Sequence, residues 1–211
     1  MTIFEIFLTI HVVCGGASLL LGLYILLAKK GTQRHKLVGN IYFYSMLLAA
    51  LLALAMSYLH PSYFLFIIGV FTSYMLITGK RYLKKKKTDD VTPVDWLLIF
   101  LMLIFGAAFI VLGSYKILHS EYFGIVLLVF GSISLLFVYQ DYINFKGRSR
   151  IKNFWLTTHI QRMIGSYIAS VTAFLVVNNT ILPGIIAWLL PTFLFVPLII
   201  KWSRKHELKQ V

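Results

Sequence analysis

The chain has 211 residues, of which 59% are hydrophobic and only 13% are charged. With a mean hydropathy of +0.84, it carries too few charges to coat a water-soluble domain, so we predict a polytopic integral membrane protein. On a soluble surface the net charge of +13 would favour nucleic acid, but in a membrane protein its meaning depends on where the charges lie.

Seven apolar stretches follow one another, and a helix needs roughly 20 such residues to cross a bilayer. We expect transmembrane helices at residues 3–28, 37–59, 63–79, 96–118, 122–142, 155–177 and 181–200. The predicted fold is therefore all-α, with the seven helices forming one transmembrane domain. The last stretch contains Pro183, Pro191 and Pro197, which we expect to interrupt its helix.

Eighteen of the 20 lysines and arginines lie in four segments, at residues 29–36, 80–87, 146–152 and 201–211. The positive-inside rule then predicts a multi-pass protein of the bacterial cytoplasmic (inner) membrane, with its N-terminus outside and its C-terminus in the cytoplasm. Orientation and attraction to anionic lipid headgroups account for this basic face, so we predict the lipid bilayer as its partner and no nucleic acid.

The first six spans are expected to form three successive hairpins, each with a basic turn, followed by a single helix. Small residues lie on the leading helix of each hairpin: Gly15, Ser18 and Gly22; Gly69 and Ser73; Gly131 and Ser134. This pattern is typical of an internal repeat, and equally of ordinary close packing between membrane helices.

The sixth span, residues 155–178, carries two ionisable side chains on an otherwise apolar helix. His159 and Arg162 share one arc with Ser166 and Ser170, and ionisable groups inside hydrocarbon are expensive and often functional. Arg162 lies roughly 10 Å from the cytoplasmic boundary, where it either extends to the headgroups or pairs with Asp141. The predicted inner polar cluster, able to hold an anionic group, a haem propionate, a quinone oxygen or a proton, comprises His35, Asp141, His159 and Arg162.

A second candidate site lies near the outer ends of the helices. His11 is placed roughly 12 Å below the outer surface, either as a proton relay or ligand or as a buried histidine bonded to a carbonyl. Candidate ligands of an outer zinc or copper site are His11, His60, His119 and Glu121. The alternative is that the residues near the outer ends are ordinary exposed turn residues. The single cysteine, Cys14, excludes an intramolecular disulfide and a cysteine-based cluster.

Haem held by two histidines requires them at matching depth on facing helices. His11 has no other deep histidine at its level, although Met56 is near enough in depth to be a second ligand, and His35 matches His159 in depth but lies at or outside the helix boundary. These positions argue against a two-haem electron conduit and leave a single haem or metal open. No phosphate-binding glycine loop, dinucleotide motif or HExxH zinc motif occurs, so the sequence does not decide whether the protein is an enzyme.

Three short motifs resemble an uncharacterised bacterial family of multi-pass membrane proteins that is catalogued as a domain of unknown function. They are His11 with its stripe of small residues, Arg34-His35-Lys36 followed by Gly39, and His159-Ile160-Gln161-Arg162-Met163 followed by Gly165. The chain has Lys36 where that pattern has arginine, which keeps the charge and loses the planar fork. The resemblance implies no activity, but it directs attention to the positions His11, His35, His159 and Arg162.

These observations support three hypotheses. The first is a histidine-based intramembrane site that binds haem or a transition metal, or that exchanges electrons with a membrane quinone. The second is a carrier of small solutes, coupled to protons, in which Arg162 and Asp141 act together. The third is an assembly or scaffold subunit whose polar stripes only hold helices together.

Overall fold

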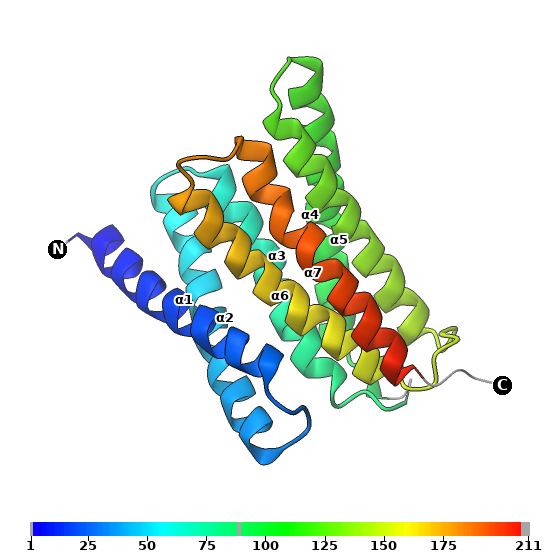
Figure 1. Cartoon of the computed structure of the whole chain (residues 1–211). Helices are drawn as coiled ribbons and strands as arrows, with labels where there is room; N and C mark the ends of the chain where they lie inside the picture. The colour runs from blue at the N-terminus through cyan, green and yellow to red at the C-terminus, as the bar shows by residue number, and fades with distance from the viewer. Residues whose placement is uncertain (1, 88–89, 208–211) are drawn as a thin grey trace.

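The computed structural model describes residues 2–87 and 90–207 (Figure 1). Its helices are α1 (Ile3–Leu27), α2 (Gln33–Leu59), α3 (Tyr63–Tyr82), α4 (Pro93–Leu118), α5 (Phe123–Phe145), α6 (Phe154–Asn178) and α7 (Gly184–His206). All seven are long and apolar enough to cross a membrane, which confirms the predicted all-α fold of seven transmembrane helices. The helices agree with the predicted spans to within a few residues, and the largest difference is that α7 continues to His206.

Polar residues at the helix starts explain where several helices begin. The side chains of Thr2, Thr32 and Ser62 each accept a hydrogen bond from the backbone N–H three residues further on, at 3.2, 3.1 and 3.4 Å. Such caps satisfy N–H groups that the first turn of a helix leaves without partners. At the start of α4, Pro93 occupies the first helical position, where its missing N–H carries no penalty.

The connections that carry the basic segments lie together. The turns after α1, α3 and α5 and the end of α7 are at the lower end of the molecule in Figure 1, and the other turns are at the upper end. We call the lower end the basic end. This arrangement is the one that the charge distribution along the sequence requires.

The helices pair differently from the three predicted hairpins. α1 packs along α2, but α3 packs chiefly along α6, and α4 along α5. The expected hairpins of α3 with α4 and of α5 with α6 are therefore wrong as packing units. In each of these hairpins the two helices follow one another in the chain, but each makes its largest contact with a different helix. The structure consists of a central group (α3, α6 and α7) with the α1–α2 pair on one side and the α4–α5 pair on the other (Figure 1).

Glycines explain why α4 and α5 pack so tightly. Gly113 faces Gly124, and Gly106 faces Gly131, in two layers along the pair. A Cβ added to Gly124 would lie 2.5 Å from the carbonyl oxygen of Gly113, closer than real Cβ atoms come to any such atom. Backbone contact of this kind makes the α4–α5 pair a close unit.

The small residues of the supposed repeat face unlike surroundings. A Cβ at Gly22 would meet the ring of Tyr167 on α6, whereas Gly69 faces α2 and Gly131 faces α4. The three leading helices therefore use their small residues against different partners, as ordinary packing requires.

The connection from α3 to α4 is held by a buried carboxylate. Asp95 receives Arg81 Nε at 2.6 Å and Lys85 Nζ at 2.7 Å, and it also accepts the backbone N–H of Thr92 at 2.9 Å. Burial lowers the pKa of the Lys85 ammonium, and the neighbouring Asp95 acts in the opposite direction. The start of α4 is thereby fixed to the end of α3.

The prolines do not interrupt the last helix, as the sequence suggested they would. Pro183 is the residue before α7, and Pro191 and Pro197 lie inside a helix that runs without a break from Gly184. A transmembrane helix tolerates proline because neighbouring helices and local adjustments satisfy the freed carbonyls.

Candidate functional site

The two charges predicted to pair do so in the interior of the bundle. Arg162 Nη2 on α6 lies 2.8 Å from Asp141 Oδ1 on α5, and both side chains have 0% of their surface exposed. Arg162 therefore does not extend to the headgroups. A pair held this far from water needs further hydrogen bonds to offset the loss of hydration.

Two tyrosines of α3 supply those bonds to the carboxylate. Tyr82 Oη donates to Asp141 Oδ1 at 2.7 Å, and Tyr74 Oη donates to Asp141 Oδ2. Asn144 extends the network, since its Nδ2 lies 3.2 Å from Tyr82 Oη and 3.3 Å from Thr158 Oγ1. Both oxygens of Asp141 are thus occupied by donors from α3 and α6.

Arg162 is satisfied on one side only. Its Nη2 also donates to the carbonyl of Phe137 at 3.2 Å and to Gln140 Oε1 at 3.4 Å. The guanidinium carbon lies 3.7 Å from the centroid of the Phe137 ring and 5.2 Å from that of Tyr74. Its Nε and Nη1 are buried and have no hydrogen-bond partner among the described residues. Three N–H donors, one on Nε and two on Nη1, are left facing the interior, where unpaired polar groups are costly.

This polar network lies at a seam between the α4–α5 pair and the central helices. α5 contributes Asp141 and Gln140, while α3 and α6 contribute the groups that bond to them, including Gln161, whose Oε1 is 2.6 Å from Gln140 Nε2. Elsewhere the seam is aromatic: Phe71 of α3 lies 5.0 Å from Phe130 of α5, and Trp188 of α7 lies 5.6 Å from the same ring. Only the part toward the basic end is charged.

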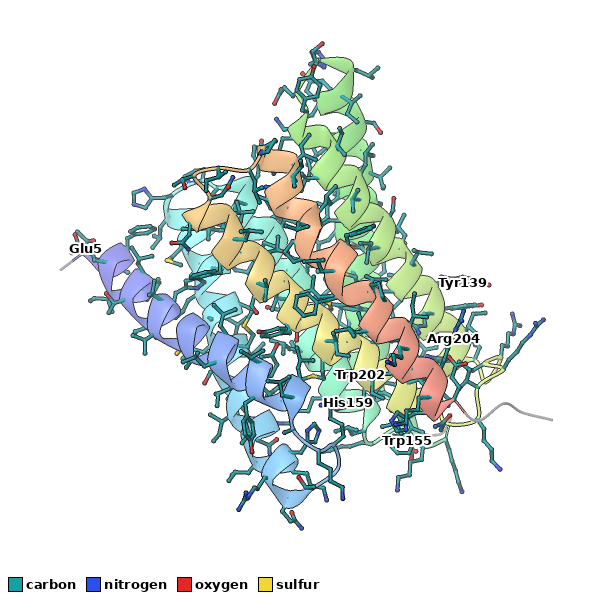
Figure 2. The ribbon with its side chains drawn as sticks, viewed as in Figure 1. Glu5, Tyr139, Trp155, His159, Trp202 and Arg204 are labelled. Atoms are coloured by element: carbon teal, nitrogen blue, oxygen red, sulfur yellow. The ribbon has the colours of Figure 1, made fainter. Side chains whose placement is uncertain are left out.

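His159 lies next to this centre, one turn closer to the basic end (Figure 2). Its Nδ1 is 2.8 Å from the carbonyl oxygen of Gly79 on α3, so Nδ1 carries the proton and Nε2 keeps a lone pair. Gly79 also allows the close approach of α3 and α6, because a Cβ there would lie 2.9 Å from Arg162 Cβ.

His35 is brought close to His159 but not to the ion pair. The two imidazoles interact electrostatically, and His35 Nδ1 is buried without a partner in the described part of the chain. Two of the four residues predicted for the inner cluster are thus joined directly. Asp141 and Arg162 are in direct contact, and His35 and His159 lie toward the basic end.

The residues predicted for an outer metal site are not brought together. His11 Nδ1 is 2.8 Å from the carbonyl of Ala49, which makes it a link between α1 and α2, and the ring of His60 packs against Phe4 at 4.3 Å. Each imidazole is held by its own neighbours.

The other two members of that set lie at the turn from α4 to α5. His119 Nδ1 is bonded to the carbonyl of Tyr115 at 2.8 Å, and Glu121 pairs with Lys116. Across residues 2–87 and 90–207, no three side chains of His, Cys, Asp or Glu are grouped so that they would hold a metal ion. His11 lies within α1, whereas the other three residues lie at the outer ends of helices that pack in different pairs.

Sequence reasoning missed Tyr74, Tyr82, Asn144 and Thr158. Tyrosine and threonine are common in helix packing, and nothing in their spacing marks them as partners of a carboxylate. Their one signal was polar character within apolar helices, where the structure buries all four side chains.

Comparison of the chain with family models, with curated proteins and with solved structures found no match, so its function is inferred below from its own residues.

Proposed function

We propose that this protein is a proton-coupled carrier of a small anionic solute, with Asp141 and Arg162 as its central site. The observation that carries the proposal is a fully buried ion pair whose arginine retains two donor nitrogens, Nε and Nη1, without a partner among the described residues. Ionisable groups inside a membrane bundle mark proton and substrate pathways more often than they serve packing alone.

The charges of the site suggest how coupling works. In the structure Asp141 neutralises Arg162, so no net charge is buried. Protonation of the carboxylate removes that neutralisation, and the guanidinium then requires an anion. A proton that binds Asp141 and an anion that binds Arg162 therefore enter together, and the site stays neutral throughout.

The site lies at the seam between the α4–α5 pair and the central helices, which suggests how the helices move during transport. The α4–α5 pair is a tight unit, and the buried charged contacts that join α5 to α3 and α6 converge on Asp141, whereas Asp95 at the start of α4 is bound to Arg81 and Lys85. A proton and an anion that replace the contacts of Asp141 would let the pair pivot about the Asp95 contacts against the central helices, as helix groups do in secondary transporters.

His159 and His35 would supply protons from the basic end. His159 Nε2 keeps a lone pair, and an imidazole is the side chain best suited to exchange protons near neutral pH. The pair lies between the ion pair and the connections of the basic end.

The test uses purified protein in liposomes that contain a pH-sensitive dye. Under an inward proton gradient, we expect inorganic phosphate or succinate to enter faster than in protein-free liposomes, with internal acidification that depends on the solute. The free amino acid alanine, which has no net charge, serves as the neutral comparison solute. Asp141→Asn should abolish the coupling, and Arg162→Lys, which keeps the charge and loses the planar fork, should abolish anion uptake.

A matched control lies at the outer end of the α4–α5 pair. Glu121→Gln removes a carboxylate from an exposed ion pair of the α4–α5 turn, so transport should be unchanged. Wild-type liposomes that move neither protons nor anions above background, or an Asp141→Asn variant that transports like the wild type, would contradict the proposal.

The charge distribution supports an inferred location and orientation. We infer a bacterial cytoplasmic membrane, with the basic end facing the cytoplasm and its anionic lipid headgroups. The gathering of the basic connections at one end of the seven-helix structure supports this orientation.

A histidine-based redox site is the second candidate, and the free Nε2 of His159 favours it. The bond from His159 Nδ1 to a carbonyl leaves Nε2 as a ligand atom, which is the usual arrangement of histidines that bind haem iron or a transition metal. A Soret band or bound metal in protein expressed with added haem, lost in His159→Phe, would support this role over the carrier. A quinone would be identified by its release on extraction of the purified protein.

A further inference from the structure

A hollow lies between the end of α1 and the start of α2, at the basic end. Its volume is about 700 Å³, and the residues that line it are Tyr24, Leu27, Ala28, Lys29, Thr32, Gln33 and Arg34. It is separate from the buried ion pair, and the proposed carrier mechanism makes no use of it.

Several basic side chains at this end already have partners. Lys30 lies over the ring of Trp202, Lys80 over Phe43, Lys86 over Trp155 and Lys146 over Trp96, and Lys85 pairs with Asp95. In contrast, the side chains of Lys29 and Arg34 have no ion-pair, ring or hydrogen-bond partner among the described residues. Two uncompensated positive charges therefore face one hollow.

The turn that presents these charges is fixed. Lys30 Nζ donates to the carbonyls of Ile25 and Leu26 at 2.6 and 2.8 Å, which caps the end of α1, and lies 4.8 Å from the centroid of the Trp202 ring. Thr32 caps α2 through the N–H of His35 at 3.1 Å. The cationic side chains thus project from a turn held at both ends.

The wall of the hollow that the end of α1 forms is apolar. Leu27 is 81% exposed and Tyr24 is 45% exposed, both on the last turns of α1. An exposed leucine beside two cations, at the depth where a helix leaves the hydrocarbon, matches a ligand with a negative head and an apolar tail. The positive end of α2 adds to the attraction of the two side chains.

We propose that this hollow binds the phosphate of an anionic phospholipid of the bilayer, such as phosphatidylglycerol. Lys29 and Arg34 hold the phosphate oxygens, Thr32 and Gln33 face the glycerol, and the upper part of an acyl chain lies along Leu27 and Tyr24. The site belongs to the α1–α2 turn and does not depend on the carrier proposal.

Native mass spectrometry of the purified full chain tests the site. The detergent-solubilised protein is titrated with phosphatidylglycerol or with phosphatidylcholine, and retained lipids are counted. We expect the wild type to retain phosphatidylglycerol in preference, and Lys29→Gln with Arg34→Gln to weaken that retention about 25-fold, since each basic residue contributes about a factor of five.

The matched control removes one lysine and one arginine elsewhere on the same face. Arg150→Gln with Lys152→Gln changes the net charge equally in the exposed α5–α6 turn, and it should weaken retention less than about threefold. Leu27→Gln should weaken phosphatidylglycerol binding and leave competition by glycerol phosphate unchanged. Circular dichroism of each variant verifies its helical content.

Three results would overturn the proposal. Equal loss in the two double variants would show attraction to surface charge alone, and equal retention of phosphatidylcholine would remove the role of the anionic headgroup. Displacement of the lipid by equimolar inorganic phosphate would assign the hollow to a free anion instead of a lipid.

Discussion

Removal of the Asp141 carboxylate should destabilise the fold strongly, because it leaves Arg162 as an isolated charge. Asp141 accepts bonds from Tyr74, Tyr82 and Arg162, and none of the four side chains reaches water to more than 5% of its surface. Asn in its place offers one acceptor oxygen, and its NH₂ group points donors at donors. Loss of one partner from a buried pair costs about 3–5 kcal/mol, which is a large part of the stability of a typical domain.

A double-mutant cycle separates the pair from the rest of the network. Asp141→Asn and Arg162→Gln should each cost several kcal/mol, whereas the double variant should cost about 2–3 kcal/mol less than their sum, since no unpaired charge remains. The assay is reversible unfolding in mixed micelles with increasing sodium dodecyl sulfate, followed by tryptophan fluorescence. Additive costs, or an Asp141→Asn variant as stable as Glu121→Gln in the exposed pair, would refute the reasoning.

Three further predictions concern the fold. Gly124→Ala should lower the free energy of unfolding in the same assay by about 1–3 kcal/mol, because its Cβ would lie 2.5 Å from a carbonyl oxygen, whereas Gly15→Ala, with nothing within 4 Å, should be neutral or stabilising. Asp95→Asn should make the α3–α4 connection more accessible to protease, since it weakens the contacts to two cations; unchanged cleavage would show that the cluster does not hold this connection. In a cysteine-free background, a cysteine at Ser120 should react with an impermeant maleimide from outside intact cells and one at Lys84 should not; the reverse pattern would invert the orientation.

The elements of this fold were predictable because hydropathy and charge act locally. A stretch of about 20 apolar residues has to be helical in lipid, where backbone groups must bond to one another, so the seven helices and most of their ends could be predicted. Helical periodicity also placed Arg162 and Asp141 on interior arcs at similar depth, which was enough to predict their contact.

Which helices lie side by side could not be predicted in the same way. The sequence indicates the depth of a residue in the membrane and the side of the helix on which it lies. The helix that packs against α3 is decided instead by side-chain fit, as at Gly79 against Arg162, and not by the order of the helices in the chain. The residues predicted for the outer metal site lie apart for this reason, because α1, which carries His11, and α4, which ends at His119, lie in pairs on opposite sides of the centre. The tyrosines around Asp141 depend on the same pairing of α3 with α5 and α6.

The buried ion pair has a consequence for biogenesis. Asp141 and Arg162 are 21 residues apart in adjacent helices, so a ribosome completes the carboxylate helix before the helix that carries the arginine. During that interval α5 enters the membrane with a carboxyl group whose cation has not yet been made, although the tyrosines of α3 are already in place. Insertion of α6 therefore completes the charge balance of the bundle, and a nascent chain that stops before α6 presents an unpaired acid that membrane quality control can recognise.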